Sequence, residues 1–308
     1  MNAANWNQLE RQIAAAVNLA RRPVAVAFLD APPAGVQKFE GSQPSGCSFW
    51  RLAASGRVFY TVPENHFNCA VGAYTHNIAL SPERQNETEQ TLKMMFDLGY
   101  VKPEEVPQIP RLAKAPKAIL YAPLGDAPVA PDVALFACKP AGAMLLNEAA
   151  ARAGVASGAP ALGRPTCMAL PASLQHGAIL SLGCMGNRVY TGLGEDELYL
   201  VVRGSDLARL ADALGVITSA NSALNDYAKG RRQQLATVQP SRHSSQLAKS
   251  VEMPCFPAFP KRLQAKKTMQ EGRNTRIFCG FSTAAARKPA FFLAFSAVWA
   301  CVPVTAWL

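Results

Sequence analysis

Four cysteines with small or polar neighbours are the residues of this sequence best suited to chemistry. Cys47 lies in SGCSFW and Cys69 in HFNCAVGAYT, whereas Cys167 and Cys184 both lie in the stretch 163–202. Thiolates attack electrophiles and bind soft metals. Zn²⁺ and iron–sulfur clusters both accept four cysteine ligands, so thiolates from separate segments would suit either one. We therefore expect Cys47, Cys69, Cys167 and Cys184 to hold one zinc ion or iron–sulfur cluster.

The spacing of these cysteines does not follow the common metal-binding motifs. The sequence contains no C-x2-C pair, so each ligand would have to come from a different loop. Cys138, which directly follows a predicted strand, could replace any of the four. Cys255, Cys279 and Cys301 lie in an irregular C-terminal region and are left out. The alternative for each cysteine is that it packs the core as a small apolar residue.

Glycine and polar residues beside two of the cysteines indicate room for a bound group. Glycine allows a backbone to come close to a ligand and leaves its amide group accessible. An arginine near a thiol favours the thiolate form. The residues expected to contact a cofactor are Gly72, Gly183, Gly186, Asn187 and Arg188.

Two further hypotheses need no metal. In the first, a thiol is the nucleophile of an enzyme, with Cys184 activated by Arg188, or Cys69 by a histidine such as His66 or His76. In the second, the chain is a non-catalytic module that binds a small ligand, and the cysteines are structural.

The positive charge of the chain is concentrated in residues 239–308. The formal net charge is +10, from 31 Lys and Arg against 21 Asp and Glu. Residues 239–308 contain ten Lys and Arg and two Asp and Glu, so +8 lies there and +2 in residues 1–238. A domain that binds nucleic acid normally shows clustered Lys and Arg. We therefore expect a small-molecule ligand or a metal as the partner of the main domain, and no nucleic acid.

Apolar runs and helical periodicity predict one α/β domain over residues 1–236, with a single mixed sheet and flanking helices. Residues 133–137 lead through a turn into a helix, a unit typical of α/β domains. Arg188–Tyr190 and Glu197–Val202 are interpreted as two strands around a glycine turn. The other predicted strands are 23–30, 57–62 and 118–121, and the predicted helices are 5–20, 82–98, 141–153, one beginning at Ser205, and 219–234.

The chain changes character after this domain. Residues 237–288 have few acidic residues and no apolar periodicity, which predicts a disordered basic tail. Residues 289–308 are uncharged and apolar, and their length reaches that of one membrane span. Membrane contact by this segment is one interpretation, and an extension unrelated to the domain, such as a read-through, is the other.

Several sequence patterns are absent, and their absence narrows the function. The first residues include Glu10 and Arg11 and do not resemble a secretory signal peptide, so we expect a cytoplasmic protein with reduced thiols. The sequence has no G-x-x-x-x-G-K-[ST], G-x-G-x-x-G, G-x-S-x-G or H-E-x-x-H motif. Nucleotide hydrolases, simple dinucleotide enzymes, esterases and zincins therefore lose support.

The order of the cysteine-containing motifs resembles the DUF169 family of bacterial and archaeal proteins, a group without an assigned function. The motifs are PVAVAFL, GCSFWRLA, NCAVGAYT, GRPTC and SLGCMGNRVYTGL, and EDELYLVV follows them. The resemblance covers about residues 8–235. It implies a cytoplasmic α/β domain with recurring cysteines, here Cys47, Cys69, Cys167 and Cys184, and it implies no particular reaction. Our leading hypothesis is a cysteine-ligated metal or iron–sulfur protein with a redox or small-molecule-handling role.

Overall fold

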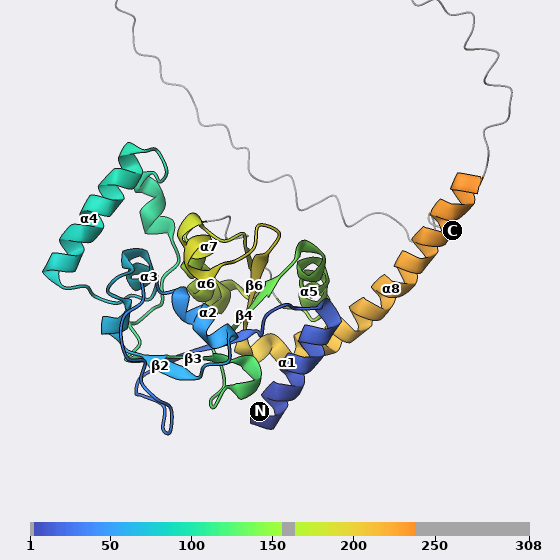
Figure 1. Ribbon diagram of the computed structural model, residues 1–308, viewed down its shortest axis with the longest axis horizontal. Coiled ribbons are helices and arrows are strands. Elements are labelled where there is room, and N and C mark those ends of the chain that lie inside the picture. The colour runs from blue at the N-terminus through green and yellow to red at the C-terminus, as the bar shows by residue number, and fades with distance from the viewer. Residues whose placement is uncertain (1–2, 156–163, 238–308) are drawn as a thin grey trace, which may run out of the picture. The chain divides into compact units, whose positions relative to one another are not determined.

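A six-stranded sheet organises residues 3–155 and 164–237, the residues that the structure, a computed structural model, describes (Figure 1). These residues belong to a unit that spans Met1–Gln239. The tail expected over 237–288 and the apolar segment 289–308 lie outside the described residues, apart from residue 237. The strands are β1 (Val24–Leu29), β2 (Phe59–Thr61), β3 (Ala118–Pro123), β4 (Val133–Cys138), β5 (Ile179–Ser181) and β6 (Leu198–Arg203). The α-helices are α1 (Ala3–Val17), α2 (Ser48–Ala54), α3 (Ala70–Thr75), α4 (Pro82–Asp97), α5 (Pro140–Arg152), α6 (Ala169–His176), α7 (Met185–Thr191) and α8 (Leu207–Thr237).

The strand order is β2-β3-β1-β4-β6-β5, and all five pairings between these strands are antiparallel. The isolated bridge between Lys38 and Tyr60 is parallel. The expected α/β class, one sheet with flanking helices, is confirmed. The central strands are apolar throughout, because helices cover both faces of the sheet.

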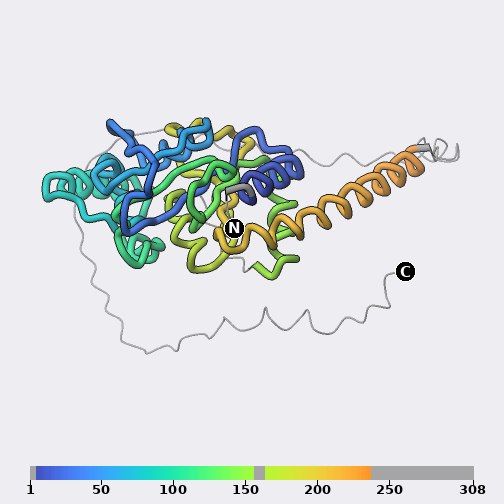
Figure 2. Tube along the Cα trace, turned by 90° about the horizontal axis from the view of Figure 1, so that it is seen from below, coloured from blue at the N-terminus to red at the C-terminus, as the bar shows by residue number. Residues whose placement is uncertain are grey.

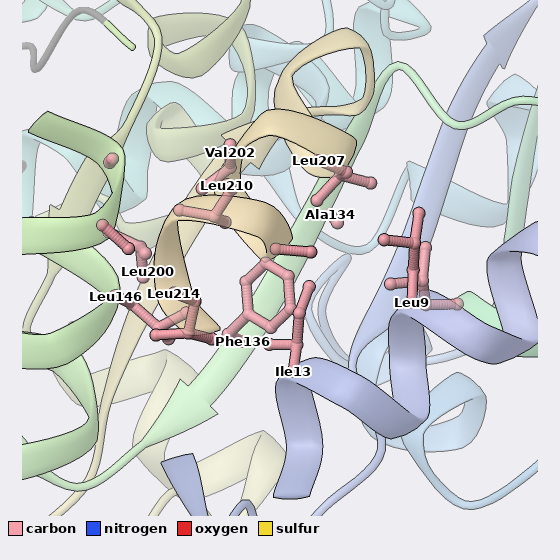
Figure 3. Packing of buried hydrophobic residues seen from close by; sticks show 14 of the residues in the cluster. Leu9, Ile13, Ala134, Phe136, Leu146, Leu200, Val202, Leu207, Leu210 and Leu214 are labelled. Carbon is pink, nitrogen blue, oxygen red and sulfur yellow. The ribbon is translucent and has the colours of Figure 1, made fainter. Parts of the chain in front are cut away.

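One face of the sheet packs against α1, α5 and α8. Alternate residues of a strand point to opposite faces, and in β4 Ala134, Phe136 and Cys138 point to this one. Figure 3 shows Phe136, which is fully buried, surrounded by Ile13 of α1 and Leu214 of α8. Helical spacing of apolar residues in α1 accounts for this contact, as the sequence predicts.

The opposite face packs against α2 and α6 and contains a group of aromatic rings. Phe49 of α2 is fully buried and lies 5.4 Å from the ring of Tyr121 in β3. Cys47 and Cys167 belong to this second core. The cysteine-bearing helices therefore lie on one face of the sheet, and α1, α5 and α8 lie on the other.

Two segments differ from the sequence prediction. Arg188–Tyr190, predicted as a strand, belongs to helix α7. The two helices predicted to begin at Ser205 and Ser219 are one continuous helix of 31 residues, α8, whose second half runs away from the sheet (Figure 2). Among the helices of residues 3–155 and 164–237, none is long and apolar enough to cross a membrane.

The sheet is built from two equivalent halves. The strand order is unchanged when β1, β2 and β3 are exchanged with β4, β5 and β6. β1 pairs with β3 from Val24 and Pro123, and β4 pairs with β6 from Val133 and Arg203. The amide of the residue after β3 and that of the residue after β6 each donate to the carbonyl that precedes the central strand of their own half, both over 2.8 Å. The six strands are thus arranged about an approximate two-fold axis between β1 and β4, with residues 24–126 as the first half and residues 133–206 as the second, although α4 and α5 have no counterpart in the other half.

Candidate functional site: a cysteine cluster between the two halves

Each of the four predicted cysteines stands at the start of a helix on the same face of the sheet. Cys47, Cys69 and Cys184 are the N-cap residues of α2, α3 and α7. Cys167 lies in the 3-10 helix Thr166–Met168 that leads into α6. The positive ends of α2, α3 and α7 are therefore next to three of the thiols, an arrangement that favours negative charge there.

The two-fold relation pairs the cysteines. Cys47 precedes Phe59, the first residue of β2, by the same interval by which Cys167 precedes Ile179, the first residue of β5. Cys69 and Cys184 begin the helices that follow β2 and β5. Their sulfur atoms accept the amide of the residue three positions on, from Gly72 over 3.3 Å and from Asn187 over 3.4 Å. The site therefore contains two equivalent pairs of cysteines, one from each half.

Contacts across the axis join these pairs (Figure 1). Helix α2 of the first half packs against α7 of the second, and α3 of the first half packs against the helical turn of Cys167. The side chain of Asn187 lies beside the thiol of Cys47, and that of Thr75 lies beside Cys167. Each half thus covers a cysteine of the other half.

Electrostatic coupling shows that the four thiols are neighbours. The pKa of Cys47 is raised to about 11, mainly by burial and to a smaller extent by Cys69 and Cys184. Burial also raises the pKa of Cys167 well above its ordinary value, and the other three cysteines all contribute. The pKa of Cys69 rises through burial and Cys184, although the amides of Gly46 and Gly72 oppose the change. Without a bound cation, Cys47, Cys69 and Cys167 are therefore neutral thiols at neutral pH.

A rise in pH above 9 is expected to destabilise the metal-free protein through Cys47. Its pKa is about 11 in the fold against 9.0 ordinarily, so the unfolded chain releases this proton first. Stability is therefore complete below pH 9 and is lost as pH rises towards 11, by about 3 kcal/mol from a shift of this size. Urea unfolding at about pH 8 and pH 10.5 measures the loss. Cys47→Ala is expected to show a smaller loss, and an equal loss in both proteins would contradict the prediction.

Cys138 is not part of this cluster. Its side chain points to the opposite face of the sheet and packs with the residues of α1, α5 and α8. Burial raises its pKa to about 12, and none of the other cysteines contributes to that shift. The prediction that Cys138 could replace one of the four ligands is therefore wrong, because alternation along β4 turns it away.

The thiols are neighbours without being closed around a point. Within residues 3–155 and 164–237, no three His, Cys, Asp or Glu side chains are arranged to hold a metal ion. Protonated thiols carry no charge, so without a bound cation no electrostatic attraction draws the four sulfur atoms closer together. The chemistry of the set still fits a soft metal, because sulfur ligands and sulfur-directed amides are both present.

Five buried side chains around the thiols contain polar atoms that have no hydrogen-bond partner among the described residues. Tyr121, which couples electrostatically to Cys47, Cys69 and Cys167, is one of them. Burial holds the pKa of Tyr121 above its ordinary value, so its hydroxyl stays protonated. Native proteins rarely leave buried polar atoms unpaired, so each of these atoms needs an explanation, either an ordered water or another bound group. The atoms are Trp50 Nε1, His66 Nδ1, His76 Nε2, Tyr121 Oη, Asn187 Nδ2 and Asn187 Oδ1.

Acid is expected to destabilise the protein through His76. Burial lowers its pKa to about 4 from an ordinary 6.5, so the unfolded chain takes up this proton first. Stability is therefore complete above pH 6.5 and is lost as pH falls towards 4, by about 3 kcal/mol. Unfolding in urea at about pH 7 and pH 4.5 measures the loss. His76→Thr is expected to reduce it, and an unchanged loss in that variant would contradict the prediction.

The residues predicted to contact a cofactor have different environments. Gly72 lies so close to Cys69 that a Cβ atom would be 2.9 Å from the sulfur, which only glycine avoids without moving the thiol. Gly183 has φ +80°, a conformation that other residues rarely adopt. At Gly186 a Cβ atom would meet only the ring of Tyr190, at 3.9 Å, so nothing there requires glycine. Asn187 is fully buried beside Cys47.

Arg188 is used to fix the loop after α7. Its guanidinium donates to the carbonyl oxygens of Leu182, Gly194 and Glu197, the last over 3.0 Å. The carboxylate of Glu197 pairs instead with Arg21, also at 3.0 Å. The hydrogen bonds of Arg188 thus support a structural role and give no sign of the proposed activation of Cys184.

The sequence did not single out three polar residues near the cysteines, namely Tyr121, Thr75 and Thr166. Tyr121 lies in the apolar run AILYAP, where a tyrosine reads as one more core residue. Thr75 and Thr166 contact Cys167 and the amide of Cys184, and neither stands out in the sequence. One signal in the sequence was available: the interval from Cys47 to the strand at Phe59 equals the interval from Cys167 to the strand at Ile179.

Comparison with known proteins gives one match. The model of the family DUF169, described as uncharacterised ArCR, matches residues 12–213. No curated protein and no solved structure matches the chain. The matched range contains all six strands and the four cysteines of the cluster.

Proposed function

Because the chain belongs to the DUF169 family, whose members have no assigned reaction, we propose from the site itself that Cys47, Cys69, Cys167 and Cys184 bind an iron–sulfur cluster. One observation carries the proposal: four thiols from four separate helix starts are neighbours across a two-fold axis. Cysteine is the usual ligand of such clusters. The role that follows is redox or small-molecule handling.

A cluster and a single zinc ion differ in the arrangement of sulfur atoms that they require. One ion needs all four sulfurs within bonding distance of a point. No three ligating side chains of the described residues meet that condition. In a cluster the cysteines bind different iron atoms, so their sulfurs are further apart.

The residues of the chain prepare the site for negative charge. The amides of Gly72 and Asn187 donate to the sulfurs of Cys69 and Cys184, and hydrogen bonds to sulfur are one of the factors that set cluster potentials. The apolar second core excludes water on the sheet side. A cluster bound here would supply electron transfer or a Lewis-acidic iron.

The alternatives without metal have less support. A thiol nucleophile needs a lowered pKa, whereas burial raises the pKa of Cys47, Cys69 and Cys167. A purely structural role for the cysteines leaves the unpaired atoms of His66 and Tyr121 without explanation.

Anaerobic purification followed by analysis of iron, zinc and acid-labile sulfide tests the proposal. We expect iron and sulfide in equal amounts, with a visible absorption band that bleaches on reduction. Zinc without sulfide would show that the cysteines bind a zinc ion and not a cluster. Absence of iron, sulfide and zinc from protein purified without oxygen would end the metal hypothesis.

We also infer a reducing compartment, the cytoplasm in our interpretation. The five cysteines among the described residues, Cys47, Cys69, Cys138, Cys167 and Cys184, are all free. A cysteine-ligated cluster requires its ligands in this reduced state.

A further inference from the structure

Three unpaired polar atoms belong to neighbouring side chains beside the cysteine cluster. They are Nδ1 of His66, Nε2 of His76 and the hydroxyl of Tyr121, in side chains that are 1%, 2% and 0% exposed. The ring centroid of His66 lies 5.7 Å from that of His76 and 6.4 Å from that of Tyr121. Nδ1 of His66 lies beside Gly46, the neighbour of Cys47, since a Cβ atom on that glycine would be 3.5 Å from it.

Hydrogen bonds fix both histidines as acceptors at these atoms. Nδ1 of His76 lies 2.6 Å from the carbonyl oxygen of Gly72, which can only accept, so Nδ1 carries the hydrogen and Nε2 has a lone pair. The hydroxyl of Thr61 lies 3.4 Å from the carbonyl oxygen of Ile119 and 2.8 Å from Nε2 of His66; if the hydroxyl donates to the carbonyl, Nε2 of His66 donates to the hydroxyl. Nδ1 of His66 is then the unprotonated nitrogen. Two buried imidazole lone pairs are therefore available.

Comparison of the two halves shows that the fold does not need these groups. Tyr121 pairs with Phe59, and its counterpart in the second half, which pairs with Ile179, is Val201. The counterpart of His76 is Thr191, whose hydroxyl binds the carbonyl four residues back over 2.7 Å, as the His76 ring does. Valine and threonine fill these positions in the second half, so the imidazole and the phenol at these positions are features of the first half alone.

The other unpaired atoms have simpler explanations. Trp50 borders a cavity of about 20 Å³ lined by Thr191 and Tyr199, which has room for about one water molecule. The amide of Asn187 lies beside the thiol of Cys47 and the hydroxyl of Tyr199, where it opposes the rise in the pKa of each. His66, His76 and Tyr121 are the group that remains.

We propose that His66, His76 and Tyr121 form a subsite for a small protonated amine, of the size of ammonium or methylammonium, beside the group bound by the four cysteines. An ammonium group has three donors, and the two imidazole lone pairs and the phenol oxygen are three acceptors. The phenol hydrogen is then free to point to a neighbouring sulfur. A cluster ligated by four thiolates is negatively charged, which attracts a cation. The inference rests on the proposed function for this charge.

Matched cations test the subsite by thermal unfolding of the full-length, anaerobically purified chain. Methylammonium chloride is compared with potassium chloride and with tetramethylammonium chloride, which carries the same charge without N–H donors. We expect methylammonium to raise the unfolding temperature in a saturable manner, and the other two salts to have no saturable effect. Equal behaviour of the three salts would overturn the subsite.

Variants copied from the second half make the test specific. Tyr121→Val and His76→Thr introduce the counterpart residues and are expected to abolish the methylammonium effect. Tyr121→Phe removes only the hydroxyl, and it is expected to abolish the effect without lowering stability in potassium chloride. Thr191→Ser, at the position of His76 in the other half, should keep the effect. Retention of the effect in both Tyr121→Phe and His76→Thr would overturn the proposal.

Imidazole nitrogen resonances give a second measurement on the same protein. The chain contains 4 histidines, so few signals need assignment. We expect methylammonium to shift the signals of Nδ1 of His66 and Nε2 of His76, and unmoved signals would contradict direct contact. Metal and sulfide are measured on the same sample. Metal without a methylammonium response overturns only the subsite, and a response without metal overturns only the proposed cluster.

Discussion

The double variant Cys47→Ala/Cys167→Ala is expected to contain no bound iron or sulfide after anaerobic purification. These two cysteines are counterparts in the two halves, so the variant removes one ligand from each side of the axis. A cluster left with two cysteines lacks half of its protein ligands. Cys69→Ala/Cys184→Ala removes the other pair and is expected to give the same loss. Metal and sulfide per folded chain are the measurement.

Cys138→Ala is the matched control for these variants. Cys138 is also buried and free, but it points to the opposite face of the sheet. It should keep the full metal content even if truncation in the core lowers its stability. Loss of metal in Cys138→Ala equal to that in the double variants would show that the loss reflects unfolding. Retention of full metal content in both double variants would exclude the cysteine cluster as the ligand set.

Phe136→Ala is expected to lower the free energy of unfolding by about 3–5 kcal/mol, the usual range for a buried phenylalanine. Its ring is fully buried where β4 meets α1 and α8. Much of the stability of a typical domain would be lost, because that total is only about 5–15 kcal/mol. Urea unfolding at neutral pH measures the change. A loss below about 1 kcal/mol would contradict the packing described for this face.

Phe49→Ala provides the comparison on the other face. Phe49 is as deeply buried as Phe136, but its ring lies 5.0 Å from His66 and 5.4 Å from Tyr121. Phe136→Ala should keep its metal content per folded chain, whereas Phe49→Ala should lose metal as well as stability. Equal metal content in the two variants would show that metal binding does not depend on the aromatic core around Phe49.

Much of the fold could be predicted from the sequence because its signals are local. The apolar runs at 23–30, 118–121 and 133–137 coincide with strands, and the helix predicted at 82–98 is α4. The pKa of Cys167 has contributions from Cys47, Cys69 and Cys184, the other three predicted cysteines. Small residues around thiols, taken with apolar runs, were sufficient for these predictions.

The remaining features depend on contacts that no local pattern contains. Arg188–Tyr190 alternates like a strand, but the capping of α7 by Cys184 and the capture of three carbonyls by Arg188 make it helical. The side chain of Cys138 points away from the other cysteines because of the way β4 is oriented in the sheet, which the sequence of the strand does not specify. The equivalence of the halves is not visible in the sequence, because residues at corresponding positions differ in chemistry. Val201 corresponds to Tyr121, and Thr191 corresponds to His76.

The pairing of β1 with β4 has a consequence for the origin of the chain. An antiparallel contact of a strand with its own counterpart is isologous, the kind of interface that closes a homodimer. The sheet therefore resembles two copies of a three-stranded unit joined through the short connection at 127–132. In a homodimer every substitution appears twice, whereas fusion lets one copy change alone. That freedom accounts for Tyr121 and His76 in the first half where the second half has Val201 and Thr191.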